Sequence, residues 1–150
     1  MKRFFNTTGL CKPEDHYMVD PFRDIYDDVL RLIEAKQYFL IHAPRQTGKT
    51  TLLHSLAHRL NRDGRYVAVV CSLESAGYPS ITVSDANDVF IRSLYQIAPL
   101  FLEAPMLPPN PYDDYSSSAQ LFKRYLTEWC QRLPKPLVLL LDEVDALYDD

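Results

Sequence analysis

The sequence has 150 residues, of which 47% are hydrophobic and 24% are charged, and this is typical of a globular chain with one core. Its net charge of −4 gives no overall basic character for nucleic acid or an anionic membrane, and no apolar run is long enough to span a bilayer. The three cysteines lack a Cys-x-x-Cys spacing, and no apolar signal-peptide core follows Met1. We therefore expect a cytoplasmic protein with reduced thiols.

The N-terminal part of the sequence predicts an irregular segment followed by a helix. Residues 1–15 show no periodic pattern. Asp20 is expected to cap a helix that begins with Pro21, because an aspartate accepts from a free N–H group and proline suits the first helical position. Apolar residues then recur at helical spacing and predict a helix that packs on a sheet: Phe22, Ile25, Tyr26, Val29, Leu30 and Ile33.

A strand, a loop and a helix are predicted next. The apolar run Tyr38–His42 favours a short buried strand, and Ala43–Thr50 follows it as a phosphate-binding loop. The helix is expected over Thr50–Leu60, since apolar residues at 53, 56, 57 and 60 share one face. A strand, loop and helix in this order is the context that such a loop requires.

The loop has the residue types that bind a polyphosphate. Backbone N–H groups turn inward around the phosphates at the positive end of a helix, and Gly48 provides the necessary freedom. Lys49 is expected to reach the β- and γ-phosphates, and the Thr50 hydroxyl to hold Mg2+. The pattern usually opens with glycine, and Ala43 can replace it if the backbone there needs no positive φ. The predicted nucleotide-binding residues are Ala43, Pro44, Arg45, Gln46, Thr47, Gly48, Lys49, Thr50 and Thr51.

The middle of the sequence predicts a second strand and two more helices. Tyr66–Cys71 is rich in β-forming residues, and Ser72–Ser84 is expected to be a loop. One helix is predicted over Asp85–Pro99. A second helix is expected after a capping box formed by Ser117 and Gln120, with an apolar face made of Phe122, Tyr125, Leu126 and Trp129.

A proline-rich stretch, Ala104–Tyr115, separates these two helices. We interpret it as a long surface loop, although an extended Pro-Met-Leu-Pro segment could also dock to a partner. Trp129 is interpreted as a core residue rather than part of a ligand site.

An acidic strand is the second functional motif. The apolar run Leu137–Leu141 predicts a buried parallel strand, and Asp142 and Glu143 follow it at once. Open α/β sheets place their ligands at the carboxyl ends of such strands. Asp142 is expected to hold Mg2+ and Glu143 to deprotonate the attacking water in ATP hydrolysis, with Lys49 as the other catalytic group. Asp145 receives no firm role.

Together these motifs resemble the nucleotide-binding half of an AAA-like P-loop ATPase. Phe39–Leu53 resembles its phosphate-binding loop and Leu139–Asp145 its acidic strand, and Tyr17–Pro21 lies where such proteins place a segment that touches adenine. The resemblance covers residues 16–150 as one domain. It implies an α/β fold of three α/β/α layers with a mostly parallel sheet, ATP and Mg2+ as ligands, and a hydrolase activity.

In such ATPases a sensor strand lies between the loop strand and the acidic strand, and an arginine finger and a helical lid follow. The sequence ends at Asp150, before these elements. We therefore expect a domain truncated after the acidic strand with an incomplete sheet, in which each unpaired buried backbone group costs about 1–3 kcal/mol. The expected partner is a second polypeptide or the remainder of the same ATPase.

The sequence leaves other functions open. A GTPase would show Asp-x-x-Gly after the acidic strand and an Asn-Lys-x-Asp clamp, and neither occurs within the chain. A helicase is an alternative because Asp142–Asp145 satisfies an Asp-Glu-x-Asp box, although Gln46 stands where helicase loops carry glycine. A nucleotide-binding switch or scaffold is the stronger alternative, since loss of an arginine finger alone slows hydrolysis by a factor of about 10^3–10^5.

Overall fold

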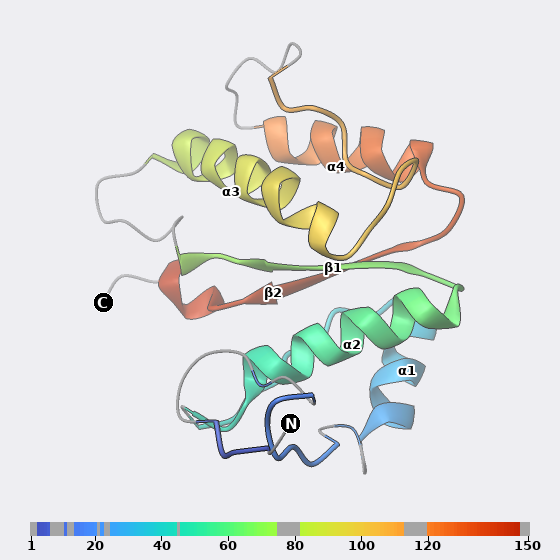
Figure 1. The fold of residues 1–150 in the computed structure, drawn as a ribbon. Helices are drawn as coiled ribbons and strands as arrows, with labels where there is room; N and C mark the ends of the chain where they lie inside the picture. The colour runs from blue at the N-terminus through green and yellow to red at the C-terminus, as the bar shows by residue number, and fades with distance from the viewer. Residues whose placement is uncertain are drawn as a thin grey trace. The chain divides into compact units, whose positions relative to one another are not determined.

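The computed structural model describes residues 3–6, 11, 14–20, 22, 25–44, 46–74, 82–112 and 120–147. Residues 1–55 and 56–150 form two units, and each is described by itself. The elements in chain order are α1 (Tyr26–Glu34), α2 (Lys49–Asp63), β1 (Val67–Ser72), α3 (Val83–Ile97), η2 (Ala98–Leu100), α4 (Leu121–Arg132), β2 (Leu137–Asp142) and η3 (Val144–Leu147) (Figure 1).

Helix α1 begins later than the sequence predicts. The Asp20 carboxylate does accept the backbone N–H of Phe22, at 2.9 Å, but this contact closes a short turn rather than capping the helix. The N-cap of α1 is Ile25, and Pro21 lies outside the described residues. The predicted cap at Asp20 is therefore wrong, while the buried face with Val29 and Ile33 is confirmed.

The C-terminal end of α1 is closed by a residue in the left-handed conformation. Lys36 has φ 54°. Its N–H bonds the carbonyl of Ile33, at 2.9 Å, and the N–H of Gln37 bonds the carbonyl of Leu32, at 3.0 Å. This pair of bonds is the Schellman arrangement, in which glycine is the usual residue at the left-handed position.

The predicted strand at Tyr38–His42 is wrong. Within the described part of residues 1–55, this segment pairs with no strand, and the exposed fractions of Tyr38 and Leu40 are 106% and 78%. An apolar run becomes a buried strand only when a neighbouring strand takes up its backbone N–H and C=O groups. The helix predicted over Thr50–Leu60 is confirmed, since α2 covers these residues and buries the predicted apolar face.

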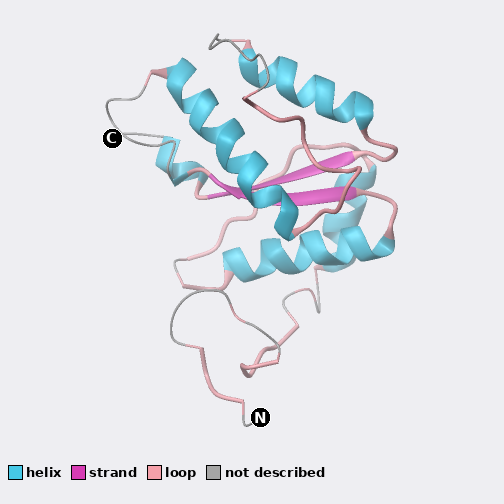
Figure 2. Cartoon of the chain, turned by 45° about the horizontal axis from the view of Figure 1, so that its top comes forward, coloured by secondary structure: helices cyan, strands magenta, loops and turns pink. Residues whose placement is uncertain are grey.

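The second unit contains a two-stranded parallel sheet. β1 and β2 pair in register from Val67 opposite Leu137 to Ser72 opposite Asp142, which confirms both predicted strands (Figure 2). The register sets the two carboxyl ends side by side. This is an α/β fold with a small parallel sheet.

Helices α3 and α4 cover one side of this sheet (Figure 1). α3 begins with a capping box, in which the Thr82 side chain accepts the backbone N–H of Asp85 and the Asp85 side chain accepts the backbone N–H of Thr82. The helix therefore starts at Val83, two residues before the predicted start. The predicted box at Ser117 lies outside the described residues. The core between the helices and β1 is formed by Val67, Val69, Cys71, Leu73, Phe90, Ile91, Leu94, Ala98, Leu102, Leu121, Tyr125 and Trp129.

The proline-rich stretch is packed between Met106 and Pro111 and is not a surface loop there, whereas Ala104, Pro105 and Tyr112, where its described part ends, are exposed. Pro108, Pro109 and Pro111 are buried. The Trp129 indole donates to the carbonyl of Met106, at 3.1 Å, and the Tyr125 hydroxyl donates to the carbonyl of Pro109, at 2.7 Å. These two bonds tie the stretch to α4 and confirm Trp129 as a core residue, because its side chain is fully buried.

A side-chain amide closes the outer edge of β1. Asn61 accepts the N–H of Ala68 and donates to its carbonyl, both at 2.8 Å, and it also donates to the carbonyl of Phe101, at 3.3 Å. Ala68 is fully buried, so its backbone groups need partners inside the protein. Asn61 satisfies both groups where a further strand would otherwise be required.

Candidate functional site

The predicted phosphate-binding loop runs directly into α2. The helix begins at Lys49, immediately after Gly48, whose φ of 85° is a conformation that glycine adopts without strain. Ala43 is not in the left-handed region, so the methyl group that replaces the usual glycine causes no backbone strain there. Gln46 also has a positive φ, 61°, although it carries a side chain, and this conformation costs about 1 kcal/mol or more. Arg45 lies outside the described residues.

The side chains of the loop bond to its own backbone. Lys49 Nζ donates to the carbonyls of Ala43 and Pro44, both at 2.9 Å. The Thr47 hydroxyl donates to the same Pro44 carbonyl, at 2.7 Å. The lysine is thus folded back over the loop, and its ammonium is held by two carbonyl oxygens of the predicted nucleotide-binding residues.

The two threonines that follow Lys49 differ in their surroundings. Thr50, the predicted magnesium ligand, is exposed at the start of α2. Thr51 Oγ1 accepts the backbone N–H of Cys11, at 3.4 Å, which links the N-terminal segment to this helix within residues 1–55. Thr50 is therefore the more exposed of the two threonines.

The acidic end of β2 forms the second half of the predicted site. Asp142 is the last residue of the strand, and Glu143 leaves it with φ 56°, in the left-handed region. Asp142 Oδ1 accepts the N–H of Glu143, at 3.1 Å. Such strain at a strand end sets the direction in which the glutamate side chain leaves the sheet.

A serine that the sequence analysis missed contacts this glutamate. Ser72 Oγ donates to Glu143 Oε2, at 3.2 Å, and accepts the N–H of Glu74, also at 3.2 Å. The parallel register places Ser72 opposite Asp142 and so next to Glu143. The available signal was that Ser72 directly follows the predicted strand Tyr66–Cys71, at the same sheet edge as the acidic pair.

The loop belongs to residues 1–55 and the acidic strand end to residues 56–150, so each half of the site is described on its own. Asp145 lies in η3 and is exposed. No cluster of three or more His, Cys, Asp or Glu side chains suited to a metal occurs among the residues that the structure describes.

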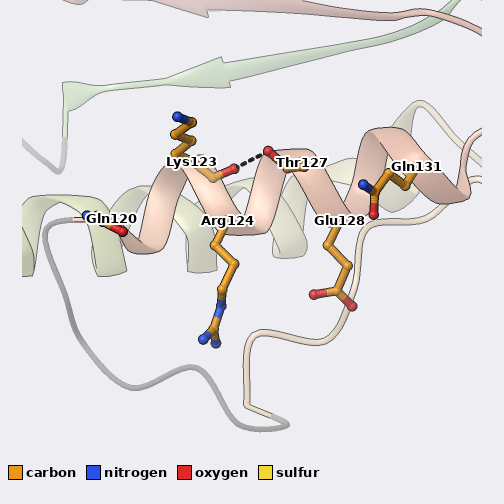
Figure 3. Close-up of a pocket in the computed structure, with 6 residues that line it drawn as sticks. All are labelled: Gln120, Lys123, Arg124, Thr127, Glu128 and Gln131. Carbon is orange, nitrogen blue, oxygen red and sulfur yellow. Dashed lines mark hydrogen bonds between the residues drawn. The ribbon is translucent and has the colours of Figure 1, made fainter.

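A shallow hollow on α4 is separate from both motifs (Figure 3). It is lined by polar and charged residues. Thr127 donates to the carbonyl of Lys123, at 2.7 Å, and Glu128 pairs with Arg132 on the same helix. These are contacts of a solvated helix face. The lining residues are Gln120, Lys123, Arg124, Thr127, Glu128 and Gln131.

Comparison with known proteins identifies the family. Residues 19–150 match the family described as AAA ATPase domain, which is most of the chain and includes both motifs. The chain belongs to the AAA ATPase domain family. No curated protein and no solved structure matches it. No helix among the described residues of this AAA ATPase domain is long and apolar enough to cross a membrane.

Proposed function

We propose that the chain binds Mg2+-ATP through residues Ala43–Thr51 and that the complete domain hydrolyses it. The observation that carries the proposal is the start of α2 at Lys49, directly after Gly48 at φ 85°, in a chain of the AAA ATPase domain family. The first N–H groups of a helix have no partner within the helix, and together with the helix dipole they favour an anion. A triphosphate is the anion that a Gly-Lys-Thr sequence at this place favours.

Each remaining residue of the site has a separate role in this proposal. Lys49 contacts the β- and γ-phosphates and offsets the charge that develops during phosphoryl transfer. Glu143 takes a proton from the attacking water, and its bond from Ser72 holds the carboxylate in one orientation. These roles require the loop and the acidic strand end to act on one nucleotide.

The residues proposed for Mg2+ suit that ion. Thr50 offers a hydroxyl oxygen and Asp142 a carboxylate oxygen, which are the hard ligands that Mg2+ prefers, and nucleotide phosphates complete such sites. When bound, the ion neutralises phosphate charge.

The domain bounds and the layers of the fold are part of the same proposal. We place a nucleotide-binding domain over residues 16–150, after an N-terminal segment of residues 1–15, with three α/β/α layers. Within the described part of residues 1–55, Tyr38–His42 pairs with no strand, and we propose that further β-structure pairs with it. A second polypeptide or the remainder of the ATPase is the partner that would supply it.

Binding and hydrolysis are tested separately. A titration with a fluorescent ATP analogue and Mg2+ should show saturable binding that the variant Lys49→Ala loses, while circular dichroism shows both proteins folded. Glu143→Gln should keep the affinity and lose hydrolysis, because the amide is of similar size but cannot take the proton. Wild-type binding without any hydrolysis would instead indicate a nucleotide-binding switch, and a folded chain without saturable binding would overturn the proposal.

A further inference from the structure

The N-terminal segment precedes the region that matches the AAA ATPase domain family, and it contacts the helix that follows the predicted phosphate-binding loop. The family match begins at residue 19. The backbone N–H of Cys11 donates to Thr51 Oγ1, at 3.4 Å, across 40 residues of sequence. Thr51 is the third residue of α2, directly after Lys49 and Thr50. A segment outside the matched region therefore reaches the first turn of this helix.

Backbone bonds on either side of Cys11 join the two ends of this segment. The N–H of Phe4 donates to the carbonyl of Asp15, at 3.1 Å, and the N–H of Tyr17 donates to the carbonyl of Phe4, at 3.0 Å. The rings of Phe4 and His16 meet edge-on with 4.8 Å between their centroids, and only 8% of His16 is exposed. Cys11 thus belongs to a closed loop, and it loses less conformational entropy on making a contact than a residue in a free chain end would.

The contact restrains the residues that we propose for phosphate and Mg2+ binding. The N–H of Leu52 donates to the carbonyl of Gly48, at 2.9 Å, and closes the first turn of α2 around Thr51. Residues within one hydrogen-bonded turn move together, so a contact that restrains Thr51 also restrains Lys49 and Thr50. Restraint of a binding site in advance strengthens binding, because less freedom is lost when the ligand arrives.

We propose that the N-terminal brace, which comprises Phe4, Cys11 and residues 15–17, holds the first turn of α2 in position for Mg2+-ATP. Thr51 is the positioning residue through which the brace acts. The gain in affinity rests on the proposed function, whereas the docking of the brace on α2 requires no ligand. Because binding free energies are reciprocal, a brace that strengthens nucleotide binding is itself held more firmly when the nucleotide is bound.

The thiol of Cys11 provides a test without nucleotide. A thiol reagent at pH 8 should label it about 2- to 5-fold faster in Thr51→Val, which keeps the shape of the side chain but cannot accept the bond. Cys130 is the internal reference because it is exposed and lies in the second unit, and unlabelled Cys71 shows that the fold is intact. Thr51→Ser keeps the hydroxyl and should label at the wild-type rate. An unchanged Cys11 rate in Thr51→Val would overturn the brace.

Saturating Mg2+-ATP gives the reciprocal test. It should slow the labelling of Cys11 about 2- to 5-fold in the wild type but not in Thr51→Val, and it should leave the labelling of Cys130 unchanged. Faster labelling of Cys11 would mean that the nucleotide displaces the brace. Slowing that persists in Thr51→Val would mean that the nucleotide shields the thiol directly. Either result would overturn the role of Thr51.

The affinity is tested from Cys11, which lies outside the proposed nucleotide-binding residues. Cys11→Pro removes the donating N–H and should weaken the Mg2+-ATP affinity about 2- to 5-fold, whereas Cys11→Ala keeps the N–H and should bind as the wild type does. Adding Thr51→Val to Cys11→Pro should weaken binding no further, since both changes remove one bond. Wild-type affinity in Cys11→Pro would overturn the positioning role. Absence of binding in the wild type would overturn the proposed function, and the labelling of the nucleotide-free protein would still decide whether the brace docks.

Discussion

The hydroxyl of Ser72 donates a hydrogen bond to the carboxylate of Glu143, with 3.2 Å between Oγ and Oε2, although 71 residues separate them in sequence. The contact arises because β1 and β2 are parallel and in register up to Ser72 and Asp142. Glu143 leaves the strand at a positive φ, which turns it toward the neighbouring strand end. The residue proposed as general base thus has its orientation set by the strand beside it.

Removal of this contact should slow hydrolysis without weakening binding. Ser72→Ala leaves the carboxylate free to rotate, and the loss of one orienting hydrogen bond corresponds to a factor of about 2–10 in the rate of ATP hydrolysis. The affinity for Mg2+-ATP should be unchanged, which separate titration and steady-state measurements can establish. Ser72→Thr is the matched control, because it retains the hydroxyl. A full rate in Ser72→Ala would show that Glu143 needs no help from β1.

Loss of the amide at Asn61 should destabilise the second unit. Asn61→Leu leaves the N–H and C=O of the buried Ala68 without their partner, and an unsatisfied buried group costs about 1–3 kcal/mol. Urea unfolding followed by circular dichroism should show this lower free energy of unfolding. Asn61→Asp still accepts from the N–H but cannot donate to the carbonyl. Its free energy of unfolding should lie between those of Asn61→Leu and the wild type. Equal stability of Asn61→Leu and the wild type would mean that water replaces the amide.

Glycine at position 36 should stabilise α1. Lys36 has φ 54° at the end of the helix, where a side chain causes strain and glycine causes none. Lys36→Gly should therefore raise the free energy of unfolding by up to about 1 kcal/mol, since relief of strain outweighs the entropy lost by glycine. Lys36→Ala removes the charge but keeps Cβ, so it should bring no gain. The same gain in both variants would point to charge rather than to backbone conformation.

The three cysteines should react with a thiol reagent in a fixed order. Burial raises the pKa of the Cys71 thiol from its ordinary value of 9.0 to about 11, and it also raises the pKa of Cys130, which is nevertheless exposed. At pH 8 the reagent should therefore label Cys130 and the half-buried Cys11 in the native protein, while Cys71 should react only on unfolding. Peptide mapping after labelling checks this order, and fast labelling of Cys71 would contradict the burial of β1.

The same pKa shift has a consequence for stability. The folded-state pKa of Cys71 lies above the unfolded value, so the stability that comes from its neutral form is fully present below about pH 9. It is lost as the pH rises toward about 11. Cys71→Ala should lose less stability than the wild type over this interval.

Much of the chain could be predicted because local patterns were consistent with the final packing. The apolar periodicity of α2, α3 and α4 and the apolar runs of β1 and β2 all correspond to observed elements. The residues predicted to bind phosphate follow one another in sequence, so the loop before α2 could be located from local order alone. Its assignment to nucleotide binding still depends on the measurements above.

Tyr38–His42 shows where such reasoning fails. Its apolar run favours a strand as strongly as that of Leu137–Leu141, yet only the second has a partner strand among the described residues. The prediction for the proline-rich stretch was wrong in the opposite sense, since a segment expected at the surface is packed. The side chains of Tyr125 and Trp129 bond it to α4. A strand partner and a packing surface both come from distant residues, which a local pattern cannot contain.

The sequence by itself determined the order of the main helices and of strands β1 and β2, the apolar faces of the helices and the positions of Lys49, Asp142 and Glu143 along the chain, because these depend on spacing and residue type. Only the tertiary structure decided the left-handed backbone of Gln46 and Glu143, and the pairing of Ser72 with Glu143. Register between strands and the conformation of a strained loop are set by contacts between residues far apart or in unusual geometry. Neither leaves a periodic trace in the sequence.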